Sequence, residues 1–386
     1  MMRFAHQAAL HLGARLVSVG LSFLLFAWIG RVLPAPEAAK AYFFSFVLGF
    51  GLSTARMSLQ LGAAIDGGSR MAQRGRDAHR GLAILKYILI VLALGVGSMT
   101  WIYTSNPVLV MLAMVVTVLA GPDMDLLRGI AGRSSLFAIS FSAGSLLALA
   151  LLQWLLPRTF TGVVLALLAQ WLPVCVLNWP VVRRFWWRIG KVRVPASIVL
   201  GVLALAGFDG LILNAPFFGW LPMAIQDSLD LALVMRVFVA SLPILPLLLH
   251  WSNSAAFVRM CHAMGTSVQV GFLLGLLSSG LLAGCAFLGI YMLISKQIVT
   301  LTVIGLYALL LISYSMFVPQ MRFTATRLPV GQRVRLLSTV AVANFAALAA
   351  LMHIGLLKPQ IIVLIQALAL LGAAAWLRHA ARPKHT

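Results

Sequence analysis

The chain has 386 residues, of which 62% are hydrophobic and only 10% are charged, and its mean hydropathy is +1.01. These values exclude a soluble globular domain and indicate an integral membrane protein. The formal net charge of +21 is interpreted as membrane topology and contact with anionic lipids, and not as nucleic-acid binding.

Apolar segments of about 20 residues, separated by short polar loops, predict an all-α polytopic transmembrane helix bundle. Twelve spans are expected, at residues 8–30, 41–65, 82–103, 107–127, 134–155, 161–181, 195–218, 229–251, 267–295, 297–318, 336–356 and 360–378. The least clearly defined boundaries are the end of the fourth span and the division between the ninth and tenth spans at Lys296.

Lysine and arginine gather in alternate loops, as the positive-inside rule requires. Counting by these spans, 20 of the 29 basic residues lie on one face, five on the other and four within spans. Both termini are therefore predicted to be cytoplasmic, with the protein in the inner membrane.

The topology prediction is tested by reporter fusions after Arg76, Arg188, Gly331 and Lys384. All four should report the cytoplasm, because each follows a basic cluster of the richer face. A periplasmic signal at Arg188 would contradict the division of the spans into six and six.

A basic, aromatic segment divides the predicted spans equally. Residues 182–194 contain five basic residues together with Trp186 and Trp187. We expect an N-terminal six-helix lobe at 1–181, a cytoplasmic linker at 182–194 and a C-terminal six-helix lobe at 195–386, because six spans precede this segment and six follow it. The same linker residues also suit an interfacial anchor.

Two polar stripes run along the first two predicted spans, because polar residues recur there every three or four positions. One stripe comprises His11, Arg15, Ser18 and Ser22, and the other Tyr42, Ser45, Gly49, Ser53, Arg56 and Gln60. Arginine within hydrocarbon costs roughly 2.5 to 3.5 kcal/mol, so it usually faces a wet cavity or a partner. The alternative is that the arginines extend to the headgroups. This alternative is weaker for Arg56, since about 13 Å of helix separates it from Ile65.

The predicted seventh span carries Asp209 near its middle. A carboxylate at that depth is a candidate proton or sodium site, or the counter-ion of Arg236 in the eighth span. A salt bridge that only joins the two helices is the structural alternative.

Thr300, Tyr307 and Tyr314 recur every seven residues in the tenth span, so they either line a cavity or pack between helices. The three cysteines are widely spaced and predict neither a disulfide framework nor a metal site. No phosphate-binding loop, zinc pattern or hydrolase triad is present in the sequence, and the predicted outer loops are short. We therefore expect no enzyme activity, cofactor or metal.

Four segments carry a family resemblance: Gly30 to Glu37, Tyr42 to Ser45, Gln60 to Gly62, and Asp209 with Leu211 to Leu213. They resemble Wzx-type polysaccharide flippases of the MOP exporter superfamily, which implies a MOP/MATE-like bundle of two six-helix lobes. Wzx-type flippases typically join their first two helices by an Arg-x-Leu-Gly-Pro turn, where this chain has Pro34 in place of the glycine.

The resemblance implies a flippase that moves a polyprenyl-diphosphate-linked oligosaccharide from the cytoplasmic to the outer leaflet, with surface-polysaccharide polymerase machinery as a further partner. Arginine suits a diphosphate because its planar group donates several hydrogen bonds and stays charged. Arg15, Arg56 and Arg236 are the predicted substrate-binding residues, Asp209 the coupling or counter-ion residue, and the further candidates lining the cavity are His11, Ser18, Gln60, Tyr307 and Tyr314.

Two other functions compete with the flippase interpretation. A MATE-type small-molecule antiporter shares the six-plus-six architecture but calls for an acidic cavity, whereas the spans here hold more basic than acidic residues. A membrane glycosyltransferase normally needs a longer outer loop with catalytic carboxylates.

Overall fold

The computed structural model describes residues 2–65, 74–121, 135–188, 225–241, 265–295, 299–325 and 330–380. In these ranges the regular secondary structure is entirely α-helical, which confirms the predicted fold class. The helices are α1 (Met2–Val32), α2 (Ala35–Ile65), α3 (Arg74–Thr104), α4 (Pro107–Ala120), α6 (Ser135–Trp154), α7 (Phe160–Ala169), α8 (Leu172–Arg188), α10 (Ile225–Ser241), α13 (Gly265–Ser295), α14 (Leu301–Ala325), α15 (Val330–His353) and α16 (Pro359–Ala380).

The helices follow the predicted spans closely. Six apolar helical stretches in the described part of the chain are long enough to cross a membrane, and one of them, Phe160–Pro180, includes both α7 and the first half of α8. Three shorter helical stretches are also apolar. The protein is therefore a multi-pass membrane protein. The predicted span at 195–218, which includes Asp209, lies outside the described residues.

The chain divides into two compact units, Met1–Gly210 and Leu211–Thr386. Residues 182–188, where the sequence predicts the start of a linker, form the C-terminal part of α8 in the first unit. The two units are described separately below.

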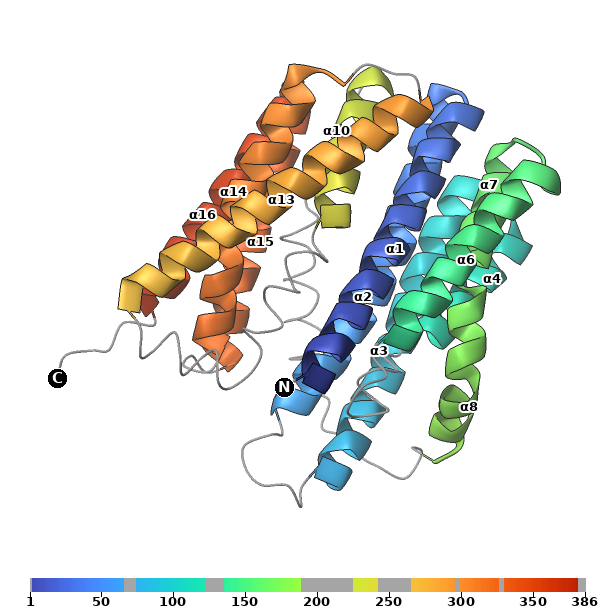
Figure 1. Ribbon diagram of the computed structural model, residues 1–386, viewed down its shortest axis with the longest axis horizontal. Coiled ribbons are helices and arrows are strands. Elements are labelled where there is room, and N and C mark those ends of the chain that lie inside the picture. Colours follow the sequence, from blue (N-terminus) through green and yellow to red (C-terminus); the bar gives the residue numbers. More distant parts are fainter. Residues whose placement is uncertain are drawn as a thin grey trace. The chain divides into compact units, whose positions relative to one another are not determined.

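In the first unit α1 packs mainly on α6, and α2 on α3 (Figure 1). Helix α7 contacts both α2 and α6, and α8 contacts α4 and α6. Large apolar side chains such as Phe23, Phe44 and Ile88 are buried between these helices. Others point outward: Ile102 is 66% exposed and Trp154 78% exposed. Such a surface suits lipid rather than water.

The predicted sixth span is not one continuous helix. It divides into α7 and α8 at Gln170 and Trp171. Pro173 explains the break, because proline has no N–H to offer the carbonyl of Ala169 and its ring crowds that carbonyl. The Trp171 N–H instead donates to the Leu168 carbonyl at 3.1 Å, which tightens the last turn of α7. Gln170 is therefore held at the end of a half-helix inside the apolar span Phe160–Pro180.

In the second unit α14 packs against α16, α10 and α13, and α13 crosses α14 obliquely (Figure 1). Small residues allow this crossing. A side-chain carbon added to Gly280 would lie 2.5 Å from Leu311, and one added to Gly284 would lie 2.2 Å from the Tyr307 ring. The Gly-x-x-x-Gly spacing on α13 thus accommodates two large side chains of α14, the arrangement expected for helices that pack without a hydrophobic driving force.

Candidate functional site

A ring contact fixes how α1 and α2 face each other. The Tyr42 ring stacks on the Phe26 ring with a centroid distance of 4.0 Å, and the Tyr42 hydroxyl donates to the Phe26 carbonyl oxygen at 3.3 Å. Both residues are 4% exposed. We call this pair the clasp. It defines one face on each helix and one level along the hairpin.

The clasp places the two arginines on facing sides of the hairpin. Arg15 precedes Phe26 by eleven residues and Arg56 follows Tyr42 by fourteen, which is about three turns and about four turns of helix. Whole turns return to the same side of a helix, so the backbone puts Arg15 and Arg56 on the faces of α1 and α2 that meet at the clasp. Their side chains lie outside the described part of the structure.

The two arginines also lie at nearly the same level. Along their helices they are on the order of 16 Å and 21 Å from the clasp, a difference of about one turn. Both positions are on the side of the clasp away from the turn between α1 and α2, the side predicted to be cytoplasmic. Measured along its own helix, Arg15 is nearer the clasp than Arg56 is.

The stripes between the clasp and the arginines are small and polar. On α1, Ser18 is 6% exposed and Ser22 is half-buried. On α2, Gly49 lies about two turns from Tyr42 on the same face, and no atom of the described residues is within 4 Å of a side-chain carbon added there. Among the described residues, the α2 stripe therefore has free space beside it between the clasp and Arg56.

The buried side-chain amide of Gln170 contacts the α1 stripe at Ser22. Gln170 is 3% exposed, and its Nε2 donates to the Ser145 Oγ of α6 at 2.9 Å and to the Ser22 Oγ of α1 at 3.4 Å. Sequence reasoning missed Gln170, although an amide in the middle of an apolar span was a usable signal. It gave more weight to the charged residues.

Two arginine positions on facing sides of one hairpin, at nearly one level, require an explanation. Unit charges repel by 332/(εr) kcal/mol, which is about 4 kcal/mol at 4 Å and an effective dielectric constant of 20. Opposing arginines in a membrane are therefore stable only when they are wetted, far apart or bridged by an anion. A diphosphate, with several charged oxygens, is a suitable bridge.

The remaining predicted site residues fall into three groups. His11 and Gln60 lie in α1 and α2, but their side chains are outside the described set. Asp209 is outside it altogether. Arg236 is half-buried in α10 and already interacts with neighbouring groups.

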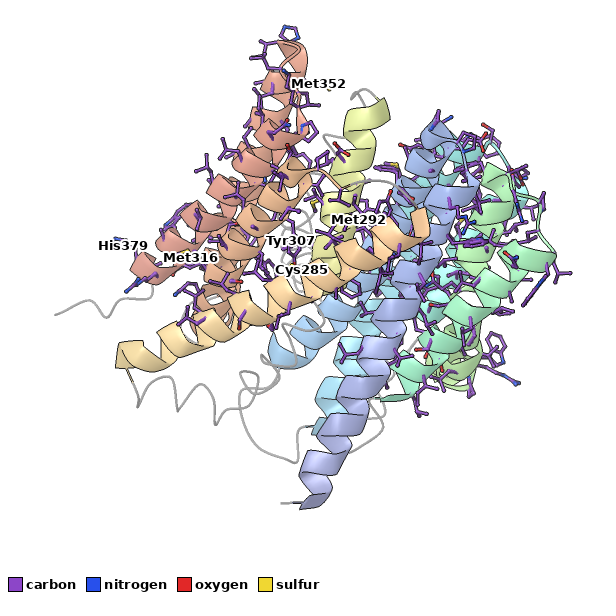
Figure 2. The ribbon with its side chains drawn as sticks, turned by 45° about the horizontal axis from the view of Figure 1, so that its top comes forward. Cys285, Met292, Tyr307, Met316, Met352 and His379 are labelled. Carbon is purple, nitrogen blue, oxygen red and sulfur yellow. The ribbon has the colours of Figure 1, made fainter. Side chains whose placement is uncertain are left out.

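Tyr307 and Tyr314 take part in helix packing in the second unit. The Tyr307 hydroxyl donates to the Gly280 carbonyl oxygen of α13 at 2.6 Å, where α14 meets α13 (Figure 2). Tyr314 contacts Phe238 of α10 edge to face, with a centroid distance of 5.3 Å. For Tyr307 this contact corresponds to the packing alternative that its seven-residue spacing left open.

Comparison with solved structures identifies the fold. The chain is similar to "Crystal structure of MATE in complex with Br-NRF", with a TM-score of 0.56 and 14% identity over 97% of this chain and 94% of that one. It is also similar to the inward-facing conformation of a multidrug resistance MATE family transporter of the MOP superfamily, with a TM-score of 0.55 and 14% identity over 97% and 98%. The outward-facing conformation of a transporter of that description gives 0.55 and 13% over 97% and 95%.

These likenesses establish a MATE-like fold for this chain. No protein-family model matches the sequence, and no curated protein matches it.

Proposed function

We propose that this protein is a MOP-type transporter and that its cargo is a polyprenyl-diphosphate-linked oligosaccharide, carried from the cytoplasmic to the outer leaflet. The observation that carries the proposal is the placement of Arg15 and Arg56 on facing sides of one hairpin at nearly one level. The fold, shared with MATE transporters, supports transport rather than catalysis. The sequence resemblance to Wzx-type flippases supports the lipid-linked glycan.

The charge balance favours an anion over the cationic or neutral cargo of an antiporter. Arg15 and Arg56 are permanently charged at any physiological pH, and the stripes that contain them offer hydroxyls and an amide but no carboxylate. A diphosphate would be bound in the cytoplasmic half of the hairpin, and the sugars would be next to the polar stripes. Arg236 and Asp209 remain proposals for cargo binding and for ion coupling.

The proposal is tested by locating the lipid-linked oligosaccharide in cells that lack this protein. It should accumulate on the cytoplasmic leaflet, out of reach of a membrane-impermeant lectin or glycosidase added to spheroplasts. Restoring the wild-type gene should restore access to the outer leaflet. Normal outer-leaflet access without the protein would remove the flippase function and make the antiporter function the first choice.

A further inference from the structure

We infer that Gln170 is a positioning residue, which fixes the rotation of α1 so that Arg15 faces α2. The inference deepens the proposed function and rests on it, because it assigns the orientation of the anion site to a residue of a different helix. It starts from the polar contacts that α1 makes in the first unit.

Interhelical hydrogen bonds hold α1 at Phe26 and at Ser22, which are one turn apart. At Phe26 its backbone carbonyl accepts from Tyr42 of α2, and at Ser22 its side chain accepts from Gln170. The apolar contacts of a membrane helix specify rotation weakly, because lipid tails satisfy the same surface, whereas interhelical hydrogen bonds have a direction. The two bonds together define which side of α1 meets α2.

Arg15 follows the rotation set at Ser22. The two residues are seven positions apart, which is about two turns, so they lie on the same side of the helix. The clasp alone holds α1 at a level about three turns away from Arg15. The hydrogen bond from Gln170 fixes α1 at Ser22, one turn closer to Arg15. Loss of this bond should allow the N-terminal part of α1 to rotate.

Gln170 is itself immobilised by the break in the sixth span. The side-chain amide of Gln170 also donates to Ser145. The backbone carbonyl of Gln170 lies directly against Gly144, where a side-chain carbon would clash with the carbonyl oxygen. Pro173 produces the break that allows this approach. An amide anchored in this way can orient a neighbouring helix without contacting cargo.

The test measures the rotation of α1 directly. In a background with Cys175, Cys261 and Cys285 replaced by alanine, the pairs Arg15→Cys/Arg56→Cys and Leu16→Cys/Arg56→Cys are joined by a short bismaleimide in membranes. Mass spectrometry of the joined peptides gives the ratio of the two products. With Gln170 present we expect the 15 to 56 pair to dominate, because Leu16 lies about 100° further round the helix.

Gln170→Leu should lower this ratio by about three- to fifteenfold, the range that one interhelical hydrogen bond in a membrane supports. Ser22→Ala, which removes only the acceptor on α1, should lower it in the same direction. Asn178→Leu is the matched control: Asn178 Nδ2 also makes a partly buried interhelical bond, to the Leu119 carbonyl at 2.8 Å, but that bond joins α8 to α4. Its ratio should stay unchanged.

An unchanged ratio in Ser22→Ala would overturn the inference, even if Gln170→Leu failed to accumulate. The crosslinking ratio does not depend on transport. The inference about Gln170 can therefore hold even if the flippase proposal fails. It can also fail while Arg15 and Arg56 remain essential for export.

Discussion

Replacing Arg56 by alanine should reduce glycan export by at least about tenfold while the protein accumulates normally in the membrane. The loss follows from the charge-assisted hydrogen bonds to the diphosphate, each of which contributes about 1.5 to 3 kcal/mol. The normal level follows from the opposite effect on insertion, because removing a membrane arginine saves roughly 2.5 to 3.5 kcal/mol. Arg15→Ala should behave in the same way. The measurement is export together with membrane protein level for each variant.

Lysine substitutions at positions 15 and 56 distinguish the effect of charge from that of side-chain shape, and a substitution of Arg31 tests the effect of position. Lysine keeps the charge but loses the planar, multidentate group, so Arg15→Lys and Arg56→Lys should each retain partial export. Arg31→Ala is the matched control. Arg31 belongs to the same hairpin but lies at the opposite end of α1, exposed, with its guanidinium carbon 5.3 Å from the centroid of the Trp28 ring. Its loss should leave export near normal. Normal export by both alanine variants at positions 15 and 56 would make the antiporter function the better explanation.

The sequence was sufficient for the helices because hydropathy and length decide what crosses a bilayer. Helices α6, α13 and α16 begin and end within about two residues of their predicted spans, whereas α1 and α2 each begin about six residues earlier than predicted.

Hydropathy could not indicate the break at Gln170. The span Phe160–Pro180 is as apolar as its neighbours, and a single proline either kinks a helix or divides it, depending on what packs alongside. Here the carbonyl of Gln170 lies against Gly144 of another helix. That contact is a tertiary contact between separate helices, so a local sequence pattern cannot predict it.

The candidate site was predicted in part for a similar reason. Three- and four-residue spacing identified the α1 and α2 stripes, and with them Arg15 and Arg56, because helix geometry alone fixes which residues share a side. Residue spacing does not show which neighbouring helix a given helix face contacts. The clasp between Phe26 and Tyr42 supplies that information.

Gly144→Ala should lower the thermal stability of the detergent-solubilised protein by more than any other glycine-to-alanine change in the described part of the chain. The added carbon would lie 1.8 Å from the Gln170 carbonyl oxygen and 2.7 Å from its carbonyl carbon. Both atoms belong to backbone, so no side chain can rotate away and α6 must separate from α7. Overpacking of this kind typically costs about 1 to 3 kcal/mol and sometimes more. The measurement is the melting temperature followed by size-exclusion chromatography with fluorescence detection.

Gly95→Ala is the control for helix propensity, since Gly95 lies inside α3 and an added carbon there meets no atom of the described residues within 4 Å. It should be neutral or stabilising, because alanine is favoured over glycine in a helix by about 1 kcal/mol. If Gly144→Ala melts no lower than Gly95→Ala, α6 and α7 do not approach as closely as described. The bond from Gln170 to Ser145, and through it the constraint on α1, would then lose its structural basis, whereas the facing placement of Arg15 and Arg56 would stand, because it depends only on the clasp.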